Sequence, residues 1–287
     1  MKIGKLIVFL AAFALISMAV LMPAAAADNL WNGKVPPAVI DGSVVVIAPG
    51  AAGTLKVPDG ATVTVTGEIN NTKTGLVLDI GAGGKVLWQA SLIGEARPLL
   101  RVTGTGTFQA DPDGWIWNTG SGVALLAECN EVIVTGDSME HRGIVEATSG
   151  SAIEGAGLNT VVTMTGTGLA VNEAKSNINP VINMANKDNT GDNVIIEENA
   201  MVWTIASANR YAYGIQTYGD VSMTGGDVYS DAIYGRAINL VGPNSRACIT
   251  GGIVHVDGAN GVAISTATTD ISGVPANQAC AQTSVVI

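Results

Sequence analysis

One short sequence pattern returns along most of the chain and limits the folds that it can adopt. Two or three alternating apolar residues are followed by Thr-Gly or Ser-Gly. Internal repetition of this kind is typical of solenoids, in which each repeat packs only on its neighbours. The pattern occurs as VTVTG ending at Gly67, LRVTG at Gly104, VIVTG at Gly136, VTMTG at Gly166, VSMTGG from Val221, ACITGG from Ala247 and DISG at Gly273.

A second pattern, a small residue (once Val) followed by an aliphatic one, gives the length of the repeat. On average it returns about every 28 residues, a length that suits a coil of three short strands and three turns. The interval varies from coil to coil, and loops that leave the coil absorb the variation because loop closure depends only weakly on length. The aliphatic positions are Leu125, Ile153, Ile182, Ile215, Ile238 and Ile264.

The residue types agree with stacked strands. Period-two alternation turns one side of each strand inward, and β-branched Val, Ile and Thr favour a pleated surface. The 36 glycines allow turns at the corners. No capped helical stripe follows the N-terminal region. We therefore predict an all-β, single-domain parallel β-helix (β-solenoid), expected to be right-handed. A β-sandwich, whose short strands also recur at regular intervals, is the alternative.

The N-terminus has the three parts of a secretory signal peptide. Lys2 and Lys5 precede an apolar run over residues 6–21, and small residues at Ala25 and Ala27 form a cleavage site. A retained membrane anchor is the alternative, but the run is short for a span of about 20 residues. We expect a secreted or cell-surface protein with no membrane span in its mature chain.

The chain after the signal peptide (1–27) divides into three parts. Residues 28–60 are expected to lead into the solenoid and cap it, 61–273 to form its coils, and 274–287 to cap its C-terminal end. Covered ends are expected because bare strand edges invite self-association.

Charge and cysteine content restrict the partners and the chemistry. The net charge of -10 becomes -12 without the two lysines of the signal peptide, so nucleic acid is not expected as a partner. Three cysteines do not make a disulfide scaffold. Cys248 lies in an alternating apolar run and is expected in the core, although a Cys248–Cys280 bridge stays open.

Two segments carry a resemblance to a known family. GTLKVPDGATVTVTG, ending at Gly67, resembles the first coil of the pectin-lyase-like parallel β-helix superfamily. ITGGIVHVDGANGVAIS, from Ile249, is similar to repeats of bacterial cell-surface and adhesin-like proteins. The resemblance implies a solenoid, and its enzyme members imply lyase or hydrolase activity as the alternative function. The two histidines, His141 and His255, lack the surrounding motif of the hydrolases, and His255 is expected to face outward.

Two acids define the candidate chemical site. Asp231 and Asp257 occupy equivalent places in successive coils, so their carboxylates are expected about 5 Å apart. Such a pair shares a proton, binds Ca²⁺ or pairs with a cation such as Arg236. If the chain is an enzyme, these three residues are the catalytic candidates. The plainer interpretation is a solvated acidic ladder at a turn, and no cofactor besides Ca²⁺ is expected.

All five tyrosines fall between positions 211 and 234, and they define a candidate glycan surface. Aromatic faces stack on sugar rings, and arginines hydrogen-bond hydroxyls or carboxylates. An aromatic ladder that supports the coils, or a contact with another subunit, is the alternative. The candidates are Trp203, Tyr211, Tyr213, Tyr218, Tyr229, Tyr234, Arg210 and Arg236. We therefore expect a non-catalytic solenoid with a structural, adhesive or glycan-contacting role, with self-association or surface glycans as its partners.

Overall fold

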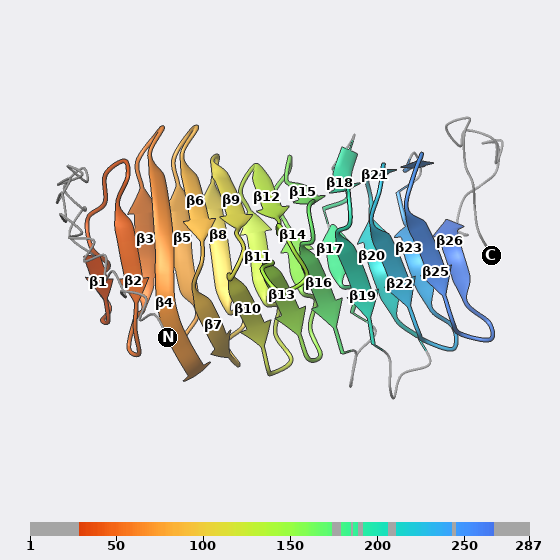
Figure 1. The fold of residues 1–287 in the computed structure, drawn as a ribbon, viewed down its shortest axis with the longest axis horizontal. Helices are drawn as coiled ribbons and strands as arrows, with labels where there is room; N and C mark the ends of the chain where they lie inside the picture. The colour runs from red at the N-terminus through yellow and green to blue at the C-terminus, as the bar shows by residue number, and fades with distance from the viewer. Residues whose placement is uncertain are drawn as a thin grey trace, which may run out of the picture.

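The computed structural model describes residues 29–173, 179–184, 186–188, 192–205, 211–242 and 245–266. In these residues the chain winds into a rod of stacked strands, which runs from the N-terminal end to the C-terminal end (Figure 1). The predicted signal peptide, Arg210, Cys280 and the predicted cap over 274–287 lie outside the described residues.

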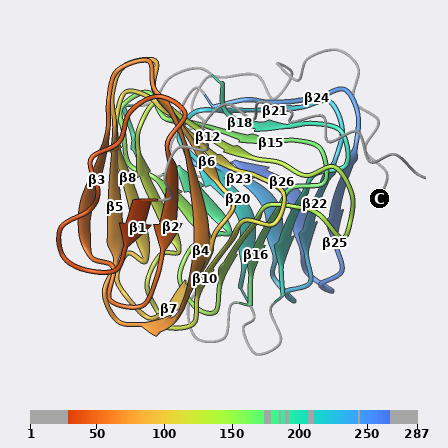
Figure 2. The same ribbon diagram turned by 60° about the vertical axis from the view of Figure 1, so that its left-hand side comes forward.

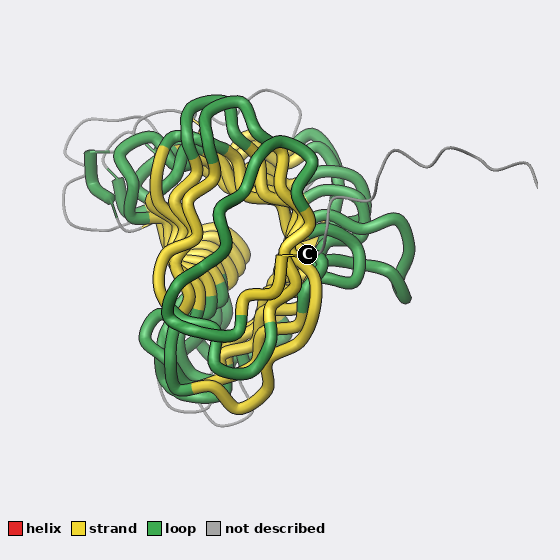
Figure 3. The backbone as a smooth tube through the Cα atoms, turned by 90° about the vertical axis from the view of Figure 1, so that its left-hand side faces the viewer, coloured by secondary structure: helices red, strands yellow, loops and turns green. Residues whose placement is uncertain are grey.

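From residue 62 onward, each coil contributes a strand, or part of one, to each of three sheets, A, C and B in chain order, and the sheets enclose a common interior (Figures 2 and 3). Every pairing between named strands of the described residues is parallel, which confirms the β-solenoid; one isolated antiparallel bridge joins Gly136 to Arg142. Sheets A and C are continuous through β4 (Thr62–Thr72), which takes part in both.

Sheet A holds the strands that most often precede a Thr-Gly corner. Besides β4 it contains β1 (Asn29–Trp31), β2 (Val44–Ile47), β6 (Lys85–Trp88), β9 (Thr107–Ala110), β12 (Glu131–Val134), β15 (Val161–Met164), β18 (Asp192–Ile196), β21 (Asp220–Met223) and β24 (Ala247–Ile249).

Sheet C follows sheet A within each coil. Besides β4 it contains β7 (Ser91–Gly94), β10 (Trp115–Asn118), β13 (Ile144–Ala147), β16 (Leu169–Asn172), β19 (Met201–Thr204), β22 (Asp227–Ser230) and β25 (Ile253–Val256).

Sheet B closes each coil and has nine strands. They are β3 (Gly53–Val57), β5 (Leu76–Ile80), β8 (Leu100–Gly104), β11 (Leu125–Glu128), β14 (Ile153–Gly155), β17 (Ile182–Met184), β20 (Tyr213–Thr217), β23 (Arg236–Leu240) and β26 (Val262–Thr266).

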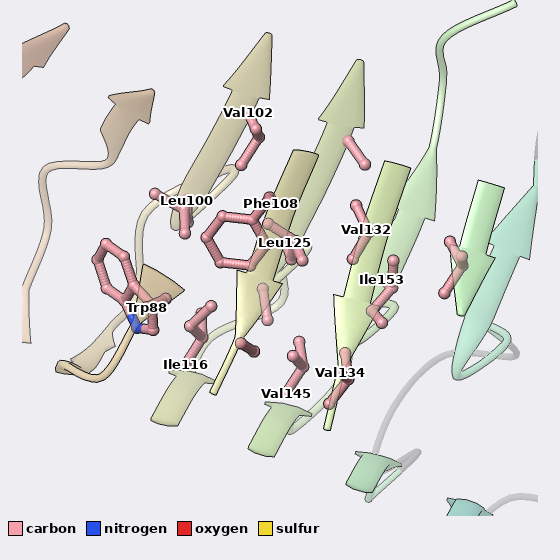
Figure 4. Packing of buried hydrophobic residues seen from close by; sticks show 14 of the residues in the cluster. Trp88, Leu100, Val102, Phe108, Ile116, Leu125, Val132, Val134, Val145 and Ile153 are labelled. Atoms are coloured by element: carbon pink, nitrogen blue, oxygen red, sulfur yellow. The ribbon is translucent and has the colours of Figure 1, made fainter. Parts of the chain in front are cut away.

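The predicted aliphatic column is confirmed at every step in sheet B. Leu125 pairs with Ile153, and the register continues through four more strands. The column members from 125 to 238 are fully buried. Figure 4 shows part of this interior, where Leu125 and Ile153 of sheet B lie close to Phe108 and Val132 of sheet A. The unequal spacing in sequence is therefore taken up outside the strands, as loop entropy predicts.

The recurring Thr-Gly pattern belongs to two different turns of the coil. Gly67, Gly166 and Gly226 lie between sheets A and C, whereas Gly104 ends β8 and leads from sheet B to sheet A. Gly104 has φ of 96°, and a Cβ there would collide with the carbonyl oxygen of Ile80. A positive φ and a close backbone carbonyl favour glycine at both turns, so the Thr-Gly dipeptide recurs at both.

Cys248 was predicted in the core, and the structure places it on the outward side of β24. It pairs with Ser222, and the inward position beside it is held by Ile249, which is buried. β24 has only three residues, and the side chains of all three are compatible with the core. The sequence therefore does not reveal which of the alternating positions face inward. Cys129 is buried, and burial raises the pKa of its thiol to about 12.

The two ends of the described stack differ in burial. The predicted entry segment, described from residue 29 to residue 60, already contains three paired strands. Trp31 is fully buried there, and its Nε1 donates to the carbonyl oxygens of Gly33 and Ala52 at 3.1 and 3.0 Å. In the last described coil, Val254 and Ile264 are only half-buried, although they pair with fully buried residues of the previous coil. Interior packing thus weakens toward the C-terminal end of this stack.

Candidate functional site

The two candidate acids follow neighbouring strands of sheet C. Asp231 comes directly after Ser230 and Asp257 directly after Val256, and Ser230 pairs with Val256. The predicted equivalence of the two acids in successive coils is therefore present in the strand register.

Asp257 is held by two neighbours on its own sheet. Its carboxylate accepts a hydrogen bond from the hydroxyl of Tyr229 and contacts Nε2 of His255 at 2.5 Å. These hydrogen bonds lower the pKa of Asp257, first through Tyr229 and then through His255. The same bond to Asp257 raises the pKa of Tyr229 to about 12, and the charge of Asp231 adds to this shift. Asp257 is thus kept ionised chiefly by hydrogen-bond donors.

Arg236 lies on a different sheet from these acids. It opens β23 of sheet B, where its Nη1 donates to Oδ1 of Asn239 at 2.9 Å and its guanidinium lies 5.6 Å from the ring centroid of Tyr213. The contacts of Arg236 are therefore with an amide and an aromatic face. Across the described ranges, no group of three or more His, Cys, Asp or Glu side chains is placed to hold a metal ion.

The candidate aromatic residues separate into groups on different faces. Trp203, Tyr229 and His255 occupy successive strands of sheet C in one outward column. Trp203 meets Tyr229 edge to face at 5.9 Å, and Tyr229 stacks on His255 at 5.2 Å with the ring planes 9° apart. His255 faces outward, as predicted. The ring faces of Tyr229 and His255 are turned toward each other, as in an aromatic ladder.

A second aromatic group lies at the corner between sheets C and B. Tyr211 and Tyr234 precede neighbouring strands and stack at 5.1 Å, with Tyr211 half exposed. Tyr213 and Arg236 open the same two strands and are paired in register. Tyr218 follows β20 at its other end, at the corner toward sheet A. Four of the eight candidates thus form one group, which we call the tyrosine–arginine surface: Tyr211, Tyr213, Tyr234 and Arg236.

An amide ladder extends the tyrosine–arginine surface along the rod, and the sequence analysis did not predict it. Asn183, Gln216, Asn239 and Ser265 occupy one outward column of sheet B. The hydrogen bonds between successive members are 3.4, 3.0 and 2.8 Å long. The signal was present, because each member directly follows an aliphatic residue of the repeat. Side-chain amides in register donate and accept along such a column.

A third polar group lies at the corner between sheets A and C. Asp111 is buried and accepts hydrogen bonds from the amides of Gln89 and Gln109, while Asp113 contacts Nδ1 of His141 at 3.0 Å. The hydrogen bond to Asp113 raises the pKa of His141. These contacts tie the turn over 111–114 to the coil before it and the coil after it.

No helix long and apolar enough to cross a bilayer occurs in the described part of the chain. No family model matches the chain, and neither the curated proteins nor the solved structures include one with significant similarity to it.

Proposed function

We propose that this chain is a secreted or cell-surface, non-catalytic β-solenoid that contacts surface glycans through the tyrosine–arginine surface. The observation that carries the proposal is the gathering of Tyr211, Tyr234, Tyr213 and Arg236 on two neighbouring coils, next to the amide ladder.

The chemistry of this surface suits a sugar. Tyr211 and Tyr234 stack on each other, and Tyr211 is half exposed, so its ring is accessible to the apolar face of a sugar. Arg236 is oriented by Asn239 and Tyr213, so little rotamer freedom remains to be lost when it hydrogen-bonds a hydroxyl or a carboxylate. The expected ligand is therefore a glycan with at least one face free for stacking.

The aromatic ladder on sheet C supports a different role for the remaining candidates. Tyr229 is engaged through its ring by Trp203 and His255, and through its hydroxyl by Asp257. These contacts favour a supporting or protein-contact role for Trp203 and Tyr229 over sugar stacking.

Glycan-array binding, followed by calorimetry on the best ligand, tests the proposal. Tyr211→Ala with Tyr234→Ala, and separately Arg236→Gln, are expected to weaken binding at least tenfold, about the loss of one charged hydrogen bond or one stacked ring. Tyr218→Ala is the matched control, because this tyrosine lies at the other end of β20, and it should leave affinity unchanged. Equal losses in all variants, or no binding to any glycan, would reject the proposed surface.

The alternative function, a polysaccharide lyase or hydrolase, is tested on the two acids. It requires Asp231, Asp257 and Arg236 to act together, whereas Arg236 contacts Tyr213 and Asn239 on another sheet. The protein is incubated with polygalacturonate and Ca²⁺ while the ultraviolet absorbance of unsaturated product is followed. Product formation that is lost in Asp231→Ala would replace the non-catalytic proposal with the enzymatic one.

A further inference from the structure

Six asparagine or aspartate residues of the chain are directly followed by glycine. In such a pair the backbone nitrogen of the glycine can attack the side-chain carbonyl carbon, because the glycine has no side chain that obstructs the closing ring. Asparagine, a thermolabile residue, reacts the more readily, since its amide is uncharged whereas an ionised carboxylate is a poor electrophile. The pairs begin at Asn32, Asp41, Asp59, Asp113, Asp257 and Asn260.

The fold restrains this reaction at most of the pairs. In four of them the amide of the glycine donates a backbone hydrogen bond, which fixes its peptide plane and holds its proton. The bonds are each 2.9 Å long and run from Gly42 to Thr62, from Gly60 to Ala82, from Gly114 to Asp111 and from Gly261 to Gly258. In a fifth pair, hydrogen bonds with Tyr229 and His255 lower the pKa of Asp257, so that its carboxylate stays ionised and unreactive.

The remaining pair, Asn32 and Gly33, has none of these restraints. It follows β1 at the N-terminal end of the rod (Figure 1), and Asn32 is exposed. In the described part of the chain, the amide of Gly33 donates no hydrogen bond. A Cβ on Gly33 would meet no atom within 4 Å, so the space around this residue is open. Asn32 is therefore the asparagine that the fold leaves free to react with the glycine after it.

We propose that Asn32 is a site of spontaneous deamidation, through which the chain modifies its own first coil. The nitrogen of Gly33 loses its proton to a base in the solvent and bonds to Cγ of Asn32, and the Cγ–Nδ2 bond breaks as ammonia leaves. Water then opens the resulting succinimide ring at either of its two carbonyl carbons. One opening gives aspartate, and the other gives isoaspartate, in which the main chain is longer by one carbon atom. Both products carry a new carboxylate.

The modified linkage lies where the first described coil is held together. The carbonyl oxygen of Gly33 accepts hydrogen bonds from Nε1 of Trp31 at 3.1 Å and from the amide of Ala52 at 2.9 Å, and Trp31 is fully buried. An extra main-chain atom between Trp31 and Gly33 displaces this carbonyl from both donors. The new carboxylate next to the buried indole also favours a more solvated arrangement. Conversion to isoaspartate is therefore expected to loosen the N-terminal end of the rod.

Peptide mapping by mass spectrometry, on the full chain incubated in mildly alkaline buffer, tests the proposal. The peptide that contains Asn32 should gain about 1 Da, through an intermediate that has lost ammonia. Asn32 should convert at least about fivefold faster than Asn260, because a backbone hydrogen bond has to break before Gly261 can react. Enzymatic methylation of isoaspartate distinguishes the two products.

Gly33→Ala tests whether ring closure limits the conversion. The fold accommodates this substitution, since the new Cβ meets no atom within 4 Å and the φ of Gly33 lies outside the left-handed region. The added methyl group hinders ring closure, so the conversion of Asn32 should fall to the rate of Asn260 or below. Asn260→Gln is the matched control, and it should leave the conversion of Asn32 unchanged.

Hydrogen exchange on the incubated chain measures the structural consequence. Chains with isoaspartate at position 32 should lose at least about fivefold in the protection of the Ala52 amide, the factor that one backbone hydrogen bond provides. Gly33→Ala chains incubated in the same way should keep this protection. An Asn32 that stays intact, equal rates at Asn32 and Asn260, or unchanged conversion in Gly33→Ala would overturn the proposal, as would isoaspartate with full protection of Ala52. Glycan binding by the tyrosine–arginine surface does not depend on any of these results.

Discussion

Replacement of Ile215 by alanine tests the register of sheet B, on which the fold depends. Ile215 is fully buried and pairs with Ile182 in the coil before it and Ile238 in the coil after it. The substitution removes three carbon atoms, worth about 2.4 kcal/mol at about 0.8 kcal/mol per buried CH₂. The neighbouring coils are hydrogen-bonded on both sides and cannot collapse into the space, so a cavity cost is added. We expect a total loss of about 3–4 kcal/mol in the free energy of unfolding.

The same substitution at Ile264 is the matched control. Ile264 belongs to the same column but is only half-buried in the last described coil. Loss of the same atoms there should cost about 1–2 kcal/mol, because much of the surface is already in contact with water and no closed cavity forms. Guanidinium unfolding followed by circular dichroism measures both, provided that the slope with denaturant is unchanged. Equal losses at the two sites, or a loss below about 1 kcal/mol at Ile215, would refute the stacked column.

Two further predictions concern a corner glycine and a corner histidine. Gly104→Ala should be far more destabilising than Gly60→Ala. Both positions have positive φ, which costs a residue with a side chain about 1–2 kcal/mol, but only at Gly104 does the new Cβ meet a backbone carbonyl, that of Ile80. Similar losses of stability in denaturant titrations of the two variants would contradict this. For His141, NMR titration should find a pKa above 6.5 that falls in Asp113→Asn. Because folding raises the pKa of His141, the pair stabilises the fold below the pKa of the unfolded chain, and this contribution disappears as pH rises through the pKa of the folded state. An unchanged His141 pKa in Asp113→Asn would contradict the pairing.

The fold was predictable because its signals are local and repeated. The aliphatic positions 125, 153, 182, 215, 238 and 264 recur once per coil, and all of them pair in sheet B. The alignment of Asp231 with Asp257 was predictable for the same reason, since the same offset in sequence separates Ile238 from Ile264. Trp115 and Trp117 are two positions apart in one strand, so alternation puts them on the same face, and there they stack.

The candidate glycan surface shows where reasoning from the sequence alone stopped. The tyrosines are close together in sequence, and they were predicted to form one patch. In the structure Tyr229 lies on sheet C, Tyr211 and Tyr234 lie at the next corner, and Tyr218 lies at the far end of β20. The stretch from Tyr211 to Tyr234 is close to one full coil, so it visits every face of the rod. Closeness in sequence is therefore a poor guide to closeness in space.

The coil length, the strand alternation and the inward column can all be read from the amino-acid pattern, because they follow from side-chain type and backbone geometry within one repeat. Which outward side chains meet could be learned only from the folded chain. The ladder from Asn183 to Ser265 and the contacts of Asp257 with Tyr229 join successive coils or neighbouring strands. Such contacts depend on the register between segments of different coils, and that register is set by how the coils stack.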